Sequence, residues 1–408
     1  MLLGGFRGAG QSTPEKRGLM GPRMLVLFVI VSLLNLTSFA SGQSCNSTFT
    51  PPKAGTTIEI AAAGANCNVN TAPTPCNDTG IFQAALTYLR QNGGGVISLP
   101  SGKTCAANIE IDSNTAGSSI CIAGRGRRSS FLTPYNGGSP VITISSAQGS
   151  LGGITLDNFG IKNRLGADGI NGATGLYITG TNIDDNHLFE RLYIGGNGTQ
   201  PAFVNGIKVN GRLIASQLWD IEVDGATGDA CQFDSSATGG VMNHDSFRDL
   251  QCNGSTGGWG IWVKAPPATP FHTFEFDHVN AQGNHQGGIY LNGVEEGGLY
   301  NSYIENNGSN CSPACPDGYG VKIEGTYARA FNIVGNLIWG SGTSVYNHAT
   351  LTQGSYTGNL AAGDRLDFDI NTPDARSSIL IGQNYSSKCK LVGNVVVAPS
   401  GPGTVTPH

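Results

Sequence analysis

Six five-residue segments carry the pattern that decides the fold: GLYIT (175–179), GIKVN (206–210), ACQFD (230–234), GIWVK (260–264), GIYLN (288–292) and GVKIE (320–324). Aligned on their fourth residues (Ile178, Val209, Phe233, Val263, Leu291 and Ile323), they are 31, 24, 30, 28 and 32 residues apart. Within each segment apolar and polar residues alternate, as in a strand with one buried face. A spacing near thirty residues predicts a structural repeat.

A second strand-like segment belongs to each repeat: FERLYI (189–194), LWDIEV (218–223), FRDLQC (247–252) and FDHVNA (276–281). Asp224, Asn253 and Gln282 follow these segments at the same turn. One repeat cannot bury its apolar face alone, whereas stacked repeats can. The spacing is too short for a helix in every crossover, and propeller blades are longer, about 40–50 residues. We therefore predict a coil of parallel strands, with polar turn residues stacked into hydrogen-bonded ladders.

The ends of this coil have their own signals. Residues 80–93, GIFQAALTYLRQNG, place Ile81, Ala85, Leu86 and Leu89 on one stripe, which predicts a helix. Asp78 or Thr79 could cap its start. Because a solenoid needs a cap over its open core, we expect this helix to cover the N-terminal end. Residues 401–408 predict a flexible C-terminal tail.

A family resemblance rests on the N-terminal part. Asn77-Asp-Thr79, the helix after it and GGGVISLPSG (93–102) resemble the N-terminal signature of pectate-lyase-superfamily β-helix proteins. That group includes rhamnogalacturonase- and epimerase-like domains, polygalacturonases and phage tailspike depolymerases. The resemblance implies an all-β, single-stranded right-handed parallel β-helix over residues 42–400. It also implies an extracellular enzyme that cleaves or modifies acidic polysaccharides.

Composition and the first 41 residues agree with secretion. Gly supplies 61 of 408 residues and charged residues only 12%, which favours many short strands over helices. Residues 25–40 are apolar, follow four Lys and Arg residues and precede small residues, which predicts a signal peptide over 1–41. An uncleaved anchor is the alternative, but it needs about 18–20 apolar residues.

Removing 1–41 leaves 19 basic and 27 acidic residues, a net charge of -8 that repels nucleic acid and anionic membranes. We expect no nucleic-acid partner and no membrane span in the mature chain.

Ten cysteines follow residue 41, and an even count in a secreted chain predicts disulfides without fixing their pairing. Cys311 and Cys315 flank a short loop that they could staple. Six asparagines, Asn46, Asn77, Asn197, Asn253, Asn307 and Asn384, stand in N-x-S/T sequons, which matter only in a host that glycosylates. The sequence does not set the oligomeric state.

The stacked strands would turn equivalent side chains into columns about 4.8 Å apart. One outward column is Tyr177, Lys208, Gln232, Trp262, Tyr290 and Lys322, and beside it lie Thr179, Asn210, Asp234, Lys264, Asn292 and Glu324. Aromatic rings can stack on sugars, and lysines attract carboxylates, so this face predicts binding of a polysaccharide. The alternative is a ladder that only stabilises the sheet, helped by Asp234–Lys264 and Lys264–Glu324 pairs.

Hydrolysis of a glycosidic bond needs two nearby carboxyl groups, one protonated and one ionised. His285 and Asp317 share a column just before the strands, and Asp229 lies within two residues of that column. Asp229 and Asp317 would be about 14 Å apart, against the roughly 5–9.5 Å that glycosidases use. Asp224 or Asp245 is an alternative partner for Asp229. Each of these aspartates could instead serve only to form a turn, and His285 could be only a turn donor.

Polygalacturonases offer a partial pattern. Gly228-Asp229-Ala-Cys231 resembles their paired-aspartate strand, His285 their histidine, and Gly320-Val-Lys322-Ile their basic strand. The second aspartate is absent here, and Asp229 and His285 are two repeats apart instead of one.

β-Elimination is the other chemistry, with a base that removes a proton beside a uronate carboxylate and a cation that neutralises the carboxylate. Lys208, Lys264, Lys322 or Arg248 could act as base or clamp. Ca²⁺ is a possible cofactor of such a lyase if Asp224, Asp229, Asp234 and Asp245 converge; no other cofactor is expected. We predict a secreted enzyme that cleaves a pectin-like or other acidic glycan, with hydrolysis favoured over β-elimination. The alternative is a non-catalytic glycan-binding or adhesive β-helix.

Overall fold

The computed structural model describes residues 48–52, 57–67, 76–115, 119–163, 173–182, 184–196, 203–308, 317–386 and 388–397. The chain divides into two compact units, residues 1–44 and 45–408, and every described residue belongs to the second. The predicted signal peptide and the predicted tail lie outside the described residues. Within the described part, α2 has 13 residues, and no helix is long and apolar enough to cross a bilayer.

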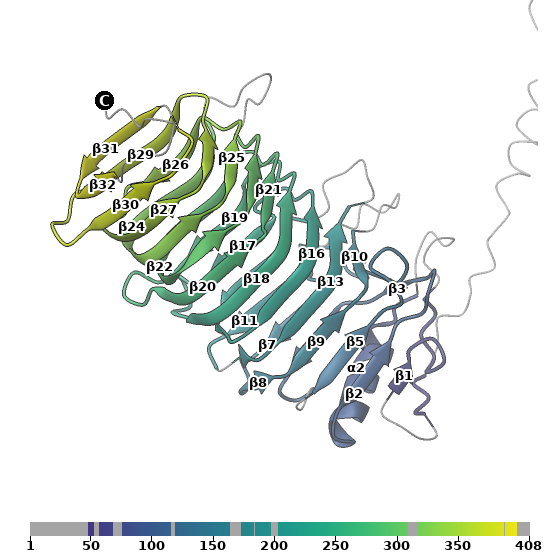
Figure 1. Ribbon diagram of the computed structural model, residues 1–408. Coiled ribbons are helices and arrows are strands. Elements are labelled where there is room, and N and C mark those ends of the chain that lie inside the picture. Colours follow the sequence, from purple (N-terminus) through teal and green to yellow (C-terminus); the bar gives the residue numbers. More distant parts are fainter. Residues whose placement is uncertain are drawn as a thin grey trace, which may run out of the picture. The chain divides into compact units, whose positions relative to one another are not determined.

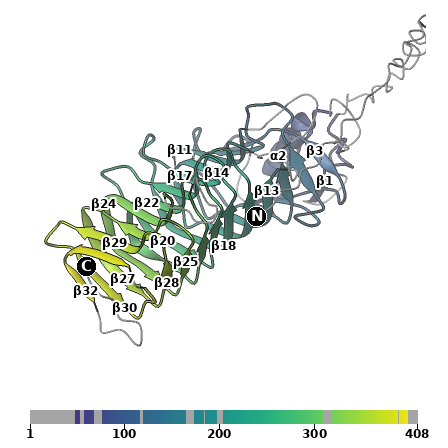
Figure 2. The same cartoon turned by 90° about the horizontal axis from the view of Figure 1, so that it is seen from above.

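The strands form one continuous coil in which every pairing among the described residues is parallel (Figures 1 and 2). Successive coils place their strands on four faces, which we call A to D. Face A contains β4 (Ile109–Asp112), β7 (Ile142–Ser145), β11 (Thr174–Gly180), β14 (Asn205–Gly211), β17 (Cys231–Asp234), β19 (Trp259–Lys264), the first parts of β22 (Gly287–Tyr300) and β24 (Tyr319–Val334), β26 (Thr343–Asn347), β29 (Leu366–Thr372) and β31 (Cys389–Gly393).

Face B is narrow and starts with β8 (Leu151–Gly152), β12 (Asp184–Asp185) and β15 (Leu213–Ile214). Face C contains β1 (Thr57–Glu59), β2 (Gly95–Ser98), β5 (Ile120–Ala123), β9 (Ile154–Asp157), β13 (Leu188–Gly195), β16 (Gln217–Asp224), β18 (Met242–Asn253), β20 (Phe271–Asp277), β27 (Leu351–Thr357), β30 (Ser378–Gly382) and β32 (Val395–Val397). Face D contains β3 (Thr104–Ala106), β6 (Phe131–Thr133), β10 (Gly160–Lys162), the last parts of β13, β16 and β18, and then β21 (Asn280–Gln282), β23 (Tyr303–Glu305), β25 (Leu337–Trp339) and β28 (Leu360–Ala362). Long strands such as β18 and β22 bend from one face to the next.

The predicted repeat is confirmed residue by residue. Ile178 pairs with Val209, and the register continues through Phe233, Val263, Leu291 and Ile323. These side chains point inward and are fully buried. A phenylalanine stack fills the middle of the core, with ring centroids 4.6 Å apart for Phe247 and Phe274 and 5.1 Å apart for Phe274 and Phe276. The alternation of inward apolar and outward polar residues along each strand therefore gives each coil an apolar interior that only the neighbouring coils can cover.

Buried asparagines hold the turns of successive coils together, as the sequence predicts for polar turn residues. The Oδ1 atom of Asn359 accepts the backbone N–H of Asn336 at 3.0 Å, and the backbone N–H of Asn359 donates to Asn384 Oδ1 at 2.9 Å. The Nδ2 atom of Asn359 also donates to the carbonyl of Ile333 at 2.8 Å. A second ladder joins Ser255, Asn284 and Asn307. Because Asn307 and Asn384 are buried in these ladders, they are unsuited to glycosylation despite their sequons.

The helix α2 (Thr79–Gln91) lies one residue earlier at its start and two earlier at its end than the sequence predicts. Its apolar stripe joins the core, because Ile81, Phe82, Ala85, Leu86 and Leu89 are buried. Closure of the core by this helix stays a prediction.

The expected side-chain cap at the start of α2 is wrong. Asp78 precedes the helix, but its carboxylate accepts the backbone N–H groups of Asn66 and Cys67 instead of those of the first helical turn.

We expect Asn359→Ala to lower the free energy of unfolding by roughly 2–5 kcal/mol, because several buried backbone groups lose their partners at once. Urea unfolding followed by circular dichroism measures the change. Asn394→Ala is the matched control, since Asn394 is exposed and donates one side-chain hydrogen bond. Equal unfolding midpoints for the two variants would contradict a structural role for the ladder.

Candidate functional site

The predicted outward column exists on face A. Tyr177 pairs in register with Lys208, and the column continues through Gln232, Trp262, Tyr290 and Lys322. The structure extends it by three residues, Tyr346, Asp369 and Lys390. The column predicted from the sequence ended three coils too early, although Tyr346 follows Lys322 at the same register.

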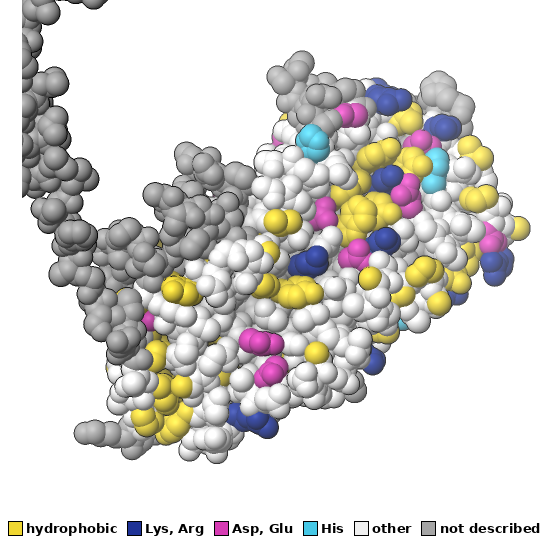
Figure 3. Space-filling view, turned by 180° about the vertical axis from the view of Figure 1, so that it is seen from behind, with side chains coloured by type: hydrophobic (Ala, Val, Ile, Leu, Met, Phe, Trp, Pro, Cys, Tyr) yellow, Lys and Arg dark blue, Asp and Glu magenta, His cyan; other side chains and the backbone are white. Residues whose placement is uncertain are grey.

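Five rings on this face form one contact group, which we call the aromatic cluster: Trp259, Trp262, Tyr290, Tyr319 and Tyr346. Trp262 stacks on Tyr290 with ring centroids 4.1 Å apart and planes 17° apart. Trp259 lies 5.3 Å from Tyr290 and 6.2 Å from Tyr319, and Tyr319 lies 5.3 Å from Tyr346. Figure 3 shows hydrophobic side chains gathered on one face among Lys, Asp, Glu and His side chains.

The expectation of open aromatic platforms is corrected in one respect. Tyr290 is only 7% exposed and Trp259 only 4%, because the rings use their faces against each other. Trp262 remains partly exposed. A sugar would therefore meet the outer surface of a packed group of rings, and reaching the inner rings requires a side chain to move.

The face has both signs of charge, so the expectation of a cationic face is also corrected. Lys322 Nζ lies 2.9 Å from Glu324 and 5.0 Å from the ring centre of Tyr319. Lys390 Nζ lies 3.9 Å from Asp369. The expected Lys264–Glu324 pair is wrong, because Asn292 lies between these two residues in the register. Lys264 is the register partner of Asp234.

Asp229 is the carboxylate most closely held on this face. It comes just before β17, where its Oδ1 accepts the backbone N–H of Trp259 at 2.8 Å and its Oδ2 accepts Gln232 Nε2 at 3.1 Å. Burial raises the pKa of Asp229 above its ordinary value, and the negative charge of Asp234 adds to the rise, while both hydrogen bonds and Lys208 oppose it. Asp229 therefore holds its proton to a higher pH than an exposed aspartate does.

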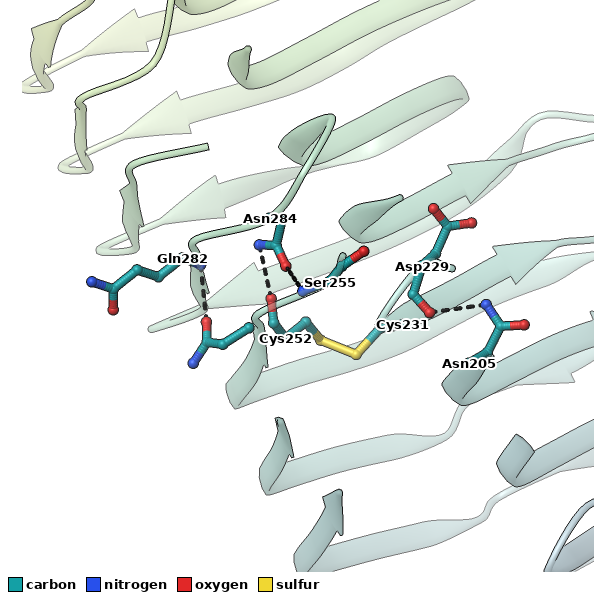
Figure 4. The surroundings of a disulfide bond; sticks show 8 residues. Asn205, Asp229, Cys231, Cys252, Ser255, Gln282 and Asn284 are labelled. Atoms are coloured by element: carbon teal, nitrogen blue, oxygen red, sulfur yellow. Dashed lines mark hydrogen bonds between the residues drawn. A yellow bond between two sulfur atoms is a disulfide. The ribbon is translucent and has the colours of Figure 1, made fainter. Parts of the chain in front are cut away.

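The backbone around Asp229 is fixed from two sides (Figure 4). Asn205 Nδ2 donates to the carbonyl oxygen of Asp229 at 2.9 Å. Two residues later, Cys231 forms a disulfide with Cys252, which ties the start of β17 to the end of β18. Figure 4 shows the carboxyl group of Asp229 pointing away from this disulfide. The core therefore anchors the strand while the carboxyl group stays on the outer side.

Asp234 is the carboxylate that Asp229 approaches. Gln232 and Asp234 point outward from β17 two residues apart, which is about 6.6 Å along a strand. The negative charge of Asp234 raises the pKa of Asp229, so the two carboxyl groups interact electrostatically on this face. Ser236 donates to Asp234 Oδ1 from its backbone N–H at 3.0 Å and from its hydroxyl at 2.6 Å. The sequence placed Asp234 in the second column but did not pair it with Asp229.

A second polar group lies four coils further along the face. His348 Nε2 is 3.1 Å from Asp369 Oδ1, and His348 Nδ1 is 2.9 Å from the hydroxyl of Tyr346. The rings of Tyr346 and His348 are stacked at 3.9 Å. The carboxylate and the ring stack fix the orientation of this histidine, which sequence analysis did not single out.

The other predicted catalytic residues do not gather around Asp229. His285 and Asp317 are exposed on turns before β22 and β24, two and three coils away. Asp224 is exposed at the end of β16 on face D. Asp245 is 1% exposed at the bend between faces B and C, where its Oδ1 accepts the backbone N–H of Ser216 at 2.9 Å. The structure thus brings together Asp229, Lys208 and Gln232, and leaves Lys322 three coils away.

The described cysteines pair only in part. Cys67 bonds to Cys105, Cys231 to Cys252, and Cys76 is also disulfide-bonded. The prediction of disulfides is confirmed, whereas Cys121 and Cys389 are free thiols. Cys311 and Cys315 lie outside the described residues.

Potential metal ligands gather at one place in the described part of the chain, at Cys67, Asp78 and Cys105. The two sulfur atoms there are joined to each other, so this group lacks the thiolates that a metal would need. The four aspartates considered for Ca²⁺ are spread over faces A and D and the B–C bend. This arrangement does not fit a Ca²⁺ site built from them.

Comparison of the structure with solved structures finds proteins of the same fold. DFA-IIIase from Arthrobacter chlorophenolicus A6 matches with a TM-score of 0.55 and 11% identity, covering 86% of this chain and 93% of that one. An exopolygalacturonase from Thermotoga maritima matches with a TM-score of 0.51 and 10% identity, covering 86% and 94%. The A-module of the Azotobacter vinelandii mannuronan C-5 epimerase AlgE6 matches with a TM-score of 0.50 and 14% identity, covering 85% and 97%.

At these identities the similarity shows the fold, a right-handed parallel β-helix, as the sequence predicts. No protein-family model matches the sequence, and no curated protein matches it either.

Asp245 gives a prediction about stability. Burial raises the pKa of Asp245 well above the ordinary value of 3.8. As pH rises above 3.8 the unfolded chain loses this proton first, so the free energy of unfolding should fall between the unfolded and folded pKa. We expect Asp245→Asn to flatten that decline in urea unfolding measured from pH 4 to pH 7. Asp249→Asn, an exposed site on the same strand, should keep the wild-type slope. Parallel slopes for all three proteins would contradict this account.

Proposed function

We propose that this protein is a secreted polysaccharide-processing enzyme that hydrolyses glycosidic bonds of a glycan chain lying along face A. Asp229 is the proton donor and Asp234 is the second carboxylate. The observation that carries the proposal is the environment of Asp229, a partly buried carboxyl group whose pKa is raised by burial and by the charge of Asp234, and which bonds to Trp259 of the aromatic cluster and to Gln232. Two neighbouring carboxyl groups with separated pKa values are what acid–base cleavage of a glycoside requires.

The proposed step assigns each proton. Asp229 transfers its proton to the glycosidic oxygen as the bond from that oxygen to the anomeric carbon breaks. The carbon accepts an oxygen from water, and Asp234 takes up the proton that the water releases. Gln232 holds the Asp229 carboxyl group from one side, and the Trp259 backbone N–H holds it from the other. The rings of the aromatic cluster would contact the apolar faces of neighbouring sugars.

Hydrolysis accounts for these contacts better than β-elimination does. Elimination needs a cation free to neutralise a uronate carboxylate, and Lys322 and Lys390 already lie beside Glu324 and Asp369. The aspartates considered as Ca²⁺ ligands are spread over different faces. Secretion rests on the predicted signal peptide and agrees with the disulfides Cys67–Cys105 and Cys231–Cys252.

A non-catalytic glycan-binding β-helix is the second candidate. The backbone hydrogen bond from Trp259 to Asp229 favours it, because that contact would hold the turn even if the carboxyl group never transferred a proton. The two candidates share the surface and differ only in turnover.

The variant Asp229→Asn distinguishes the hydrolase from the non-catalytic glycan-binding protein. An asparagine at 229 can still accept the Trp259 N–H, and its new N–H₂ group can donate to Gln232 Oε1, a buried atom without a partner. We expect the variant to fold normally and bind glycan, but to release reducing ends at least about 100-fold more slowly, because it lacks the general acid. Reducing-end release from a panel of neutral and acidic polysaccharides measures the effect. Undiminished release would remove Asp229 from the mechanism, and binding by the wild type without any release would favour the second candidate. Release accompanied by absorbance at 235 nm would indicate β-elimination.

The pH dependence of hydrolysis provides a further check. Because Asp229 must be protonated and its pKa is raised, we expect kcat to fall on the alkaline side as Asp229 loses its proton. Asp234→Asn should lower kcat at every pH, because it removes the second carboxylate. Initial rates measured from pH 3 to pH 9 test both expectations. If the residual activity of Asp229→Asn fell at alkaline pH just as the wild-type activity does, the titrating group would be another residue.

A further inference from the structure

Three buried polar atoms without hydrogen-bond partners belong to neighbouring residues on face A. They are the indole nitrogens Nε1 of Trp259 and Trp262 and the amide oxygen Oε1 of Gln232. Gln232 and Trp262 are register partners on adjacent strands, and the rings of Trp259 and Trp262 are 6.3 Å apart. Trp259 is 96% buried, since its exposed fraction is 4%. A buried donor or acceptor without a partner is costly and calls for an explanation.

Two of the residues that carry these atoms bond to the proposed proton donor, Asp229. The Nε2 atom of Gln232 bonds to Asp229 Oδ2, and the backbone N–H of Trp259 bonds to Asp229 Oδ1. The same two residues that hold the carboxyl group therefore also carry unused hydrogen-bonding atoms. A ligand that satisfied these atoms would lie beside Asp229.

The donor and acceptor pattern identifies the class of ligand. An indole N–H only donates, and an amide oxygen only accepts. A hydroxyl group can accept from the first and donate to the second, whereas a carboxylate only accepts and would leave Gln232 Oε1 unpaired. The charges agree with this, because Lys322 and Lys390 lie beside carboxylates of the protein. The nearer Lys208 interacts electrostatically with Asp229 itself.

We propose that Trp259, Trp262 and Gln232 form a subsite for the hydroxyl groups of a neutral sugar, so that the glycan cleaved at Asp229 is uncharged at this position. The subsite rests on the proposed function for its place beside the cleaved bond. It replaces the acidic glycan that the sequence predicts with a neutral one. Because the three atoms are shielded from solvent, the sugar enters by displacing the Trp262 ring from its stack on Tyr290.

Binding to the full-length Asp234→Asn protein tests the subsite with turnover suppressed, because this variant leaves Asp229 and Gln232 unchanged. The probes are soluble arabinoxylan and β-1,4-galactan as neutral polymers, and polygalacturonate and alginate as acidic ones. Affinity electrophoresis gives the dissociation constants, and tryptophan fluorescence reports movement of the Trp262 ring. We expect a neutral polymer to bind more tightly than either acidic polymer and to change the fluorescence.

Substitutions to phenylalanine then remove single indole N–H groups and keep an aromatic ring. We expect Trp262→Phe and Trp259→Phe each to weaken binding of the neutral polymer about tenfold, the cost of one ordinary hydrogen bond. Trp219→Phe is the matched control, because Trp219 on face C also has a buried indole nitrogen without a partner. It should leave binding unchanged. If Trp259→Phe fails to fold, the partly exposed Trp262 alone decides the test.

Three results would overturn the subsite. The protein could prefer an acidic polymer, or bind none of the polymers. The third is that the three tryptophan variants bind the neutral polymer equally well. Reducing-end release by the wild type is measured in parallel, because it tests the proposed hydrolysis independently of the subsite. Cleavage of an acidic polymer would retain the hydrolase and overturn the neutral subsite. Neutral binding that depends on the two tryptophans, without any release, would retain the subsite and overturn hydrolysis.

Discussion

The parallel hydrogen-bonded register between coils is the constraint on which the rest of this structure depends. Each strand pairs with the equivalent strand one coil away, so a residue such as Trp262 is fixed between Gln232 and Tyr290. The same register places Val263 between Phe233 and Leu291 in the core. A slip by one residue would exchange the inward and outward sets along a whole strand. The core and the candidate site are therefore two faces of one pairing pattern.

Polar groups inside the coil keep that register from slipping. Asn336, Asn359 and Asn384 each accept a backbone N–H from the coil before and donate to a backbone carbonyl. Near the candidate site, the Cys231–Cys252 disulfide and the bond from Asn205 to the Asp229 carbonyl fix the segment that leads into β17. Asp229 is thus presented from a rigid support, which is what a group that must meet a substrate at a set position needs.

The candidate site differs from the asparagine ladders in how its buried hydrogen-bond donors and acceptors are paired. In the asparagine ladders the buried donors and acceptors are matched across coils, whereas around Asp229 two indole nitrogens and one amide oxygen are buried without partners. The aromatic cluster keeps these atoms dry, and the ion pair Lys322–Glu324 compensates charge within the face. Other buried atoms without partners, such as Trp219 Nε1 and Asp245 Oδ2, lie off face A. The three atoms of the candidate site differ because they belong to neighbouring residues, two of which bond to Asp229.

The sequence by itself determined the coil, its register and the outward column from Tyr177 to Lys322, because a period of two within each strand and a period near thirty between strands are local, repeated signals. It could not determine that Tyr290 would be buried by stacking, that Lys322 would pair with Glu324, or that Cys121 and Cys389 would stay unpaired, because these depend on side-chain directions and on distances between coils. The turns between strands vary in length, so spacing alone misjudged which carboxylates meet. Three-dimensional packing brought Asp229 under the charge of Asp234, moved Asp224 and Asp245 to other parts of the coil, and left the indole nitrogens without partners. Repetition encodes where each strand lies, whereas the chemistry at one point of a face is decided by the few side chains that packing brings there.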